Sequence, residues 1–180
     1  MTPTHLELWL ARHGQTTANE DGVISGWHDV ELTPAGARQA RALGARLAGV
    51  EIDRVWSSDL ARAVATARIA RGEPELDPRL REIHFGDIEG ARWDTLDERF
   101  REALLDFERF AAPGGEDLLA LSARLLDFVG SLEPGRHLVV THGGVIRMLT
   151  RDLGEDRFVP NAGLVVVDWT AREILEVWEP

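Results

Sequence analysis

Two histidines in this chain lie at the ends of short apolar runs, and each is followed directly by glycine. His13 follows the run 6–11, and His142 follows the run 138–140. Short apolar runs of this kind are typical of strands in a buried sheet, and ligands of open α/β sheets bind at the carboxyl ends of the strands. A glycine after each histidine lets the backbone approach a ligand closely. The sequence therefore predicts two imidazoles at the functional edge of one sheet.

Four motifs with polar side chains fall near the ends of predicted strands. In chain order they are Arg12-His13-Gly14-Gln15-Thr16-x-x-Asn19, Ser57-Ser58-Asp59-Leu60-x-Arg62-Ala63, Arg81-Glu82-Ile83-His84-Phe85-Gly86-x-x-Glu89-Gly90 and Thr141-His142-Gly143-Gly144. Together they supply imidazoles, arginine forks that bind phosphate oxygens in pairs, and the amides of a helix that begins near Gly144. This inventory indicates phosphoryl transfer: one imidazole attacks phosphorus, the other donates to its oxygens, and a carboxylic acid protonates the departing alkoxide.

Composition excludes several other classes of protein. The 180 residues carry a net charge of −11, which argues against binding to nucleic acid or to an anionic membrane surface. Cysteine is absent, so disulfides, thiolate zinc sites and cysteine-nucleophile phosphatase chemistry are excluded. All 20 basic residues are arginine, which also excludes Schiff-base chemistry and the P-loop lysine. The first apolar run is too short for a signal peptide, and a cytoplasmic location is expected.

The order of predicted elements indicates the fold class. Strands are expected at 6–11, 52–56, 137–141, 164–169 and 173–178, with an extended segment at 76–85 and helices at 33–49, 57–71, 94–111, 117–131 and 145–153. Strands separated by helices predict a three-layer α/β/α sandwich with a mainly parallel central sheet, and the closing hairpin predicts an antiparallel edge. We expect one domain over 1–180, in which the segment 91–116 forms a helical lid over the site.

The chain resembles the histidine phosphatase superfamily, whose fold is that of phosphoglycerate mutase. All four motifs occur in the family's order and span nearly the whole chain. The resemblance implies that His13 is the nucleophile and becomes phosphohistidine, and that Glu82 protonates the leaving oxygen and then activates water. It also implies a phosphate pocket made of Arg12, Asn19, Arg62 and His142, with His142 protonated. Neither a metal nor another cofactor is expected.

Several roles stay open at this stage. Glu89 lies in the same loop as Glu82 and is the alternative acid. Gln15 and Thr16 either contact the substrate or cap the turn after His13. Gly143, Trp27 and Trp93 are further candidates for substrate contact.

The lid segment bears on the substrate, which we expect to be a small phosphomonoester. Residues 91–112 hold four arginines against six acidic residues, so they suit a multiply charged glycerate ester poorly. Periodicity assigns Phe100 and Phe107 to the core and leaves Trp27, Trp93 and Phe110 to face an apolar or aromatic leaving group. Within the superfamily the chain is most similar to the alpha-ribazole phosphatases, which act on a benzimidazole riboside 5'-phosphate in assembling the cobalamin nucleotide loop. The alternatives are a broad-specificity phosphatase, a phosphoglycerate mutase and a phosphate-binding module without activity; nothing selects an oligomeric state.

Overall fold

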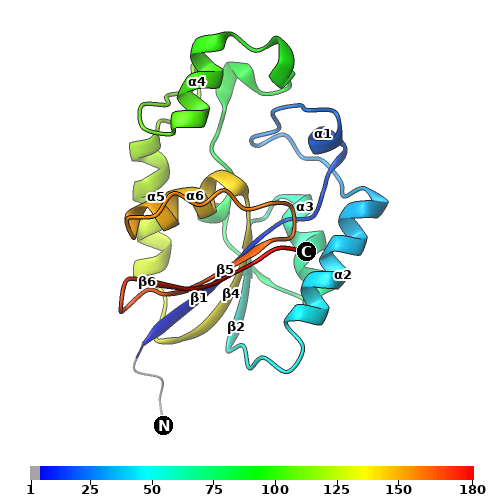
Figure 1. Cartoon of the computed structure of the whole chain (residues 1–180), viewed down its shortest axis with the longest axis vertical. Coiled ribbons are helices and arrows are strands. Elements are labelled where there is room, and N and C mark those ends of the chain that lie inside the picture. Colours follow the sequence, from blue (N-terminus) through cyan, green and yellow to red (C-terminus); the bar gives the residue numbers. More distant parts are fainter. Residues whose placement is uncertain (1–4) are drawn as a thin grey trace.

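A six-stranded sheet forms the centre of the molecule in the computed structural model, which describes residues 5–180 (Figure 1). The spatial order is β3-β2-β4-β1-β5-β6, where the strands are β1 Leu6–Arg12, β2 Arg54–Ser57, β3 Glu75–Leu76, β4 Gly135–Thr141, β5 Leu164–Asp168 and β6 Glu173–Trp178. Strands β3, β2, β4 and β1 pair in parallel, whereas β5 and β6 pair antiparallel. The predicted mainly parallel sheet with an antiparallel edge is confirmed.

Helices cover both faces of the sheet, which completes the predicted three layers (Figure 1). Helices α2 (Pro34–Arg46) and α3 (Ala61–Ala70) lie on one face, and α5 (Leu118–Gly130) and α6 (Gly143–Asp152) lie on the other. Alternation along β1 feeds both cores: Leu8 and Leu10 pack toward α5 and α6, and Trp9 and Ala11 pack toward α2 and α3. Within the described chain, no helix has the length and apolar character needed to cross a bilayer.

The irregular connections differ most from the predicted elements. The segment predicted to be extended over 76–85 is a strand only at β3 and then turns through the 3₁₀ helices Pro78–Leu80 and Gly86–Ile88. A short helix, α1 (Thr17–Glu20), lies within the predicted loop, because Thr16 and Asn19 form a capping box.

The lid helix is shorter than its apolar periodicity predicts. Helix α4 covers only Glu98–Asp106 and ends where Phe107 adopts a left-handed conformation with φ of 52°. The Arg147 guanidinium donates to the carbonyls of Leu104 and Leu105, at 2.9 and 2.6 Å, and so satisfies the last turn. A tertiary contact therefore ends a helix that the local pattern would continue.

The turn after β1 is packed tightly against the start of α2. A Cβ atom at Gly14 would lie 2.5 Å from the Gly36 carbonyl oxygen, and one at Gly36 would lie 2.1 Å from the Gln15 carbonyl oxygen. Gly14 thus serves backbone packing, whereas the sequence indicated close approach to a ligand.

Substituting Gly36 by Ala should destabilise the fold by about 1–3 kcal/mol, because the new methyl group would push the turn that carries His13 away from α2. Gly130→Ala is the matched control, since a Cβ there meets no atom within 4 Å. Urea unfolding of both variants measures the difference, and equal midpoints would contradict the packing argument.

Candidate active site

The register of the central strands brings the two histidines together. Strand β1 pairs with β4 so that Arg12 lies opposite Thr141, and the His13 amide donates to the Thr141 carbonyl at 2.9 Å. The rings of His13 and His142 lie 5.1 Å apart between centroids, edge to face. The structure thus brings both imidazoles to one sheet edge.

The His13 ring is held as a neutral imidazole with one lone pair free. Its Nδ1 lies 2.8 Å from the Gly14 carbonyl oxygen, and because a carbonyl only accepts, Nδ1 carries the proton and Nε2 the lone pair. Burial, followed by the charges of Arg62 and Arg12, lowers the pKa of His13 well below the ordinary 6.5. The ring is therefore a nucleophile at neutral pH without needing to lose a proton.

His142 begins α6 and is fully buried. Its Nε2 lies 2.8 Å from the Ser58 hydroxyl, which accepts from the Leu60 amide at 3.3 Å and so can donate to the ring. That arrangement leaves the proton on Nδ1, a buried atom without a partner in residues 5–180. Burial, then Arg62 and His13, lowers the pKa of His142 well below 6.5, so the ring acts as a neutral donor where the resemblance implied a protonated one.

Two buried arginines supply positive charge beside the histidines. Arg62 donates to the carbonyls of His28 and Gly26, at 3.0 and 2.6 Å, and Arg12 donates to the carbonyl of Val159 at 2.8 Å. The buried Nε of Arg12 has no partner in the described part of the chain. Carbonyl partners orient these guanidinium groups without neutralising them, so a phosphate dianion would satisfy both.

Asn19 lines the cavity, and the turn residues before it do not. Asn19 Oδ1 accepts from the Thr16 amide, the Thr16 hydroxyl and the Asn161 side chain, at 3.1, 3.0 and 3.1 Å. Its amide nitrogen remains as a donor for a ligand. Thr16 caps α1, and the Gln15 side chain accepts from the Thr33 hydroxyl at 2.8 Å, so the capping alternative describes both.

The Glu82 carboxyl group lies at the cavity, held by two backbone amides. Its Oε2 accepts from Gly144 at 3.1 Å, and its Oε1 accepts from Ile83 at 3.0 Å. The Gly144 amide, which the sequence indicated as a phosphate donor, is therefore used to orient Glu82. A Cβ at Gly144 would lie 2.4 Å from Glu82 Oε1, so this close approach requires glycine. Gly143 also lines the cavity, 3.4 Å from the Arg12 guanidinium carbon by the same measure.

Glu89, the alternative acid, is tied into the loops beneath the cavity. Its side chain is 5% exposed and lies 3.6 Å from His28 Nε2 and 3.8 Å from His84 Nε2. Its Oε1 accepts from the amides of Trp27 and Phe85, at 2.9 and 3.0 Å. Glu89 thus joins two loops, and Glu82 is the carboxyl group that lines the cavity.

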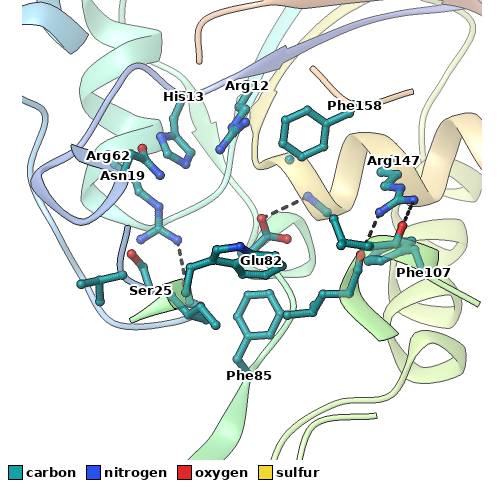
Figure 2. A pocket seen from close by; sticks show the side chains of 18 residues that line it. Arg12, His13, Asn19, Ser25, Arg62, Glu82, Phe85, Phe107, Arg147 and Phe158 are labelled. Carbon is teal, nitrogen blue, oxygen red and sulfur yellow. Dashed lines mark hydrogen bonds between the residues drawn. The ribbon is translucent and has the colours of Figure 1, made fainter. Parts of the chain in front are cut away.

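The cavity has a volume of about 370 Å³ and two unlike sides (Figure 2). His13, Arg62 and Asn19 lie on one side, Phe85, Phe107 and Phe158 lie on the other, and Glu82 lies between them. Its large apolar lining side chains are Ile24, Phe85, Trp93, Leu104, Leu105, Phe107 and Phe158. A charged pocket therefore opens directly onto an apolar one.

The aromatic residues are distributed differently from the periodicity-based expectation. Trp93 lines the cavity, but Trp27 lies outside it and donates from its indole N–H to the Glu82 carbonyl at 2.8 Å. Phe110 is buried in the core, and Phe107, expected in the core, lines the cavity. These two exchange places because α4 ends at Phe107, which breaks the helical phase on which the expectation depends.

Sequence reasoning missed two cavity residues on the segment after β4. Arg147 of α6 holds α4 in place, is paired with Asp156, and lies 4.7 Å from the Phe107 ring centroid. Phe158 is 75% exposed at the cavity, and the Arg12 guanidinium lies 5.6 Å from its ring centroid. Arg147 occurs five positions after His142, on the same helix, which was a usable signal; Phe158 lies in a loop and had none.

Comparison with known proteins identifies the family. The model of the Histidine phosphatase superfamily (branch 1) matches residues 8–178. The chain belongs to this superfamily. It is accordingly a phosphoric monoester hydrolase, and within residues 5–180 no cluster of three or more histidine, aspartate or glutamate side chains has the arrangement of a metal site.

Individual relatives divide between two activities. The chain is 36% identical over 156 residues to the adenosylcobalamin/alpha-ribazole phosphatase of Escherichia coli K12, covering 80% of this chain and 77% of that protein. It is 35% identical over 161 residues to the 2,3-bisphosphoglycerate-dependent phosphoglycerate mutase of Azorhizobium caulinodans, covering 79% and 78%.

Solved structures of relatives share the fold. The protein TTHB049 from Thermus thermophilus is 47% identical with a TM-score of 0.89, covering 97% of this chain and 100% of that one. A putative alpha-ribazole-5'-P phosphatase from Escherichia coli K-12 is 30% identical with a TM-score of 0.82, covering 98% and 97%.

The lowered histidine pKa values predict how stability depends on pH. A buried neutral imidazole binds fewer protons when folded, so the free energy of unfolding falls as pH drops below 6.5 toward the lowered folded pKa. His13→Gln should reduce that slope by about 1.4 kcal/mol per pH unit, the loss of one proton. Urea unfolding between pH 5 and 7 measures the slope, and an unchanged slope would show that His13 titrates alike in both states.

Proposed function

We propose that this histidine phosphatase hydrolyses a small phosphomonoester without a metal, through a phosphohistidine formed on His13. The observation that carries the proposal is the neutral, oriented His13 imidazole beside two buried guanidinium groups whose charge no contacting carboxylate balances. Such a site combines a nucleophile with the charge that a phosphoryl group needs.

In the first proposed step the His13 Nε2 lone pair attacks phosphorus and the bond from phosphorus to the ester oxygen breaks. Glu82 donates a proton to that oxygen, so a neutral alcohol leaves. The non-bridging oxygens accept hydrogen bonds from four donors: Arg12, Arg62, the Asn19 amide and His142 Nδ1–H. Glu82 is left ionised and His13 carries the phosphoryl group.

In the second step Glu82 takes a proton from water as the water oxygen attacks phosphorus. The N–P bond breaks, its electron pair returns to His13 Nε2, and inorganic phosphate remains in the pocket. One carboxyl group thus acts first as acid and then as base. The same four donors serve both steps, because the charge that develops stays on the same oxygens.

We propose alpha-ribazole 5'-phosphate as the substrate. The side chains that the lid segment 91–116 places at the cavity are Trp93, Leu104, Leu105 and Phe107, all of them apolar. A flat benzimidazole would bury apolar surface there. The name of the Escherichia coli relative supports the same choice.

The mutase alternative needs a cation for a second anionic group. Arg147 is the lining cation nearest to the lid, but its guanidinium is occupied by Asp156 and by the carbonyls of Leu104 and Leu105. This arrangement favours a phosphatase over a mutase. A broad-specificity phosphatase and a phosphate-binding module without activity are separated from the proposal by turnover.

Phosphate release in EDTA should be fastest, by kcat/KM, from alpha-ribazole 5'-phosphate in a panel with simple phosphomonoesters and 3-phosphoglycerate. His13→Ala should lower the rate at least about a thousandfold, because it removes the group that forms the covalent intermediate. Similar rates across the panel would favour the broad-specificity alternative. Binding of the esters without turnover would favour the inactive module.

Glu82→Gln should affect substrates according to their leaving groups. Alkyl phosphates need a proton on the departing oxygen, so their kcat/KM should fall by about 10²–10⁴-fold, whereas p-nitrophenyl phosphate should change little. Steady-state kinetics on both esters, with thermal unfolding as the check on the fold, measures this. Equal slowing of both esters would refute the role of Glu82 as the acid.

A further inference from the structure

Arg124 of α5 lies against the segment that carries Glu82. Its Nη1 donates to the carbonyls of Arg79 and Arg81, at 2.6 and 2.7 Å, and its Nη2 donates to the Glu82 carbonyl at 2.9 Å. Its side chain is 16% exposed and does not line the cavity. One guanidinium group therefore holds three carbonyls of the segment 79–82.

Glu116 orients the Arg124 fork and extends its hold on the chain. Arg124 Nε donates to Glu116 Oε1 at 2.8 Å, and Nη2 donates to Oε2 at 2.9 Å. Glu116 Oε2 also accepts from the His84 amide at 2.8 Å, and the Glu116 amide donates to the His84 carbonyl at 2.8 Å. A two-point ion pair of this kind is rigid, since both planar groups are locked in one relative orientation.

Trp27 completes the hold from another loop. Its indole N–H donates to the Glu82 carbonyl at 2.8 Å, so this one oxygen accepts from both Trp27 and Arg124. The Arg81 guanidinium, paired with Asp59, lies 4.8 Å from the Trp27 ring centroid. The backbone of Glu82 is thus fixed from two directions, and its side chain by two amides.

We infer that Arg124, oriented by Glu116, is a positioning residue for the general acid Glu82. The inference rests on the proposed function, because it assigns Arg124 an effect only on the step in which Glu82 moves a proton. A displacement of about 1 Å at a reacting group can cost about 10²-fold in rate. Without the fork, three carbonyls lose their donors and the segment relaxes toward water.

An effect of the Arg124 charge on the phosphate itself is the competing explanation. The Arg124 charge also contributes to the lowered pKa of His142, although burial and the charges of Arg62, His13 and Arg12 contribute more. A charge effect would weaken oxyanion binding and slow all esters alike. A positioning effect would leave oxyanion binding unchanged and slow the esters that need the acid.

The test compares Arg124→Gln with Arg46→Gln. Arg46 also forms a two-point pair, with Glu176, and does not line the cavity. We expect Arg124→Gln to lower kcat/KM for an alkyl phosphate by about 10–100-fold and for p-nitrophenyl phosphate by less than about threefold. The affinity for orthovanadate should be unchanged, and Arg46→Gln should match the parent protein in all three measurements.

A double variant separates failure of this inference from failure of the proposed function. In a Glu82→Gln background, Arg124→Gln should cause no further loss on the alkyl ester, because the acid is already gone. Equal slowing of both esters by Arg124→Gln, weaker vanadate binding or unchanged kinetics would each overturn the inference. If Glu82→Gln itself shows no dependence on the leaving group, the assignment of the acid fails first. Should Arg124→Gln not fold, Trp27→Phe removes the second donor to the Glu82 carbonyl and must show the same dependence in weaker form.

Discussion

The parallel pairing of β1 with β4 is the constraint on which the site depends. These two central strands are buried on both faces, and a slip of one residue would exchange the apolar sets that face the two helix layers. The register that the two cores impose therefore also sets which residues leave the sheet together. Ser58, which follows β2 and donates its amide to Val140, leaves at the same edge. Catalytic geometry is in this sense a by-product of core packing.

Electrostatics and burial act together at that edge. Buried guanidinium groups without contacting carboxylates are costly in a fold, and here their charge also keeps both imidazoles neutral. The polar atoms that lack partners, Arg12 Nε and His142 Nδ1, lie in the same place. A site that is incompletely satisfied by its own chain is prepared for an oxyanion, at the expense of stability.

Features that repeat along the sequence could be predicted, and features that depend on single distant contacts could not. Alternating and helical apolar patterns identified the layers, and the motifs at strand ends identified His13, His142, Arg12 and Arg62 as neighbours. The end of α4 depends on Arg147, some forty residues away, and the choice between Glu82 and Glu89 depends on which backbone amides each carboxyl group meets. Phe158 faces the cavity from an irregular loop, where no periodicity exists to indicate direction.

The unpaired donors have a consequence for the protein in its working environment. Under the proposed mechanism, product phosphate leaves behind the same buried N–H groups that held the substrate, so inorganic phosphate competes for them. Any oxyanion that binds only the folded chain also stabilises it by mass action. Ambient phosphate would then set two quantities in opposite senses: a higher concentration makes the protein harder to unfold and slower to turn over.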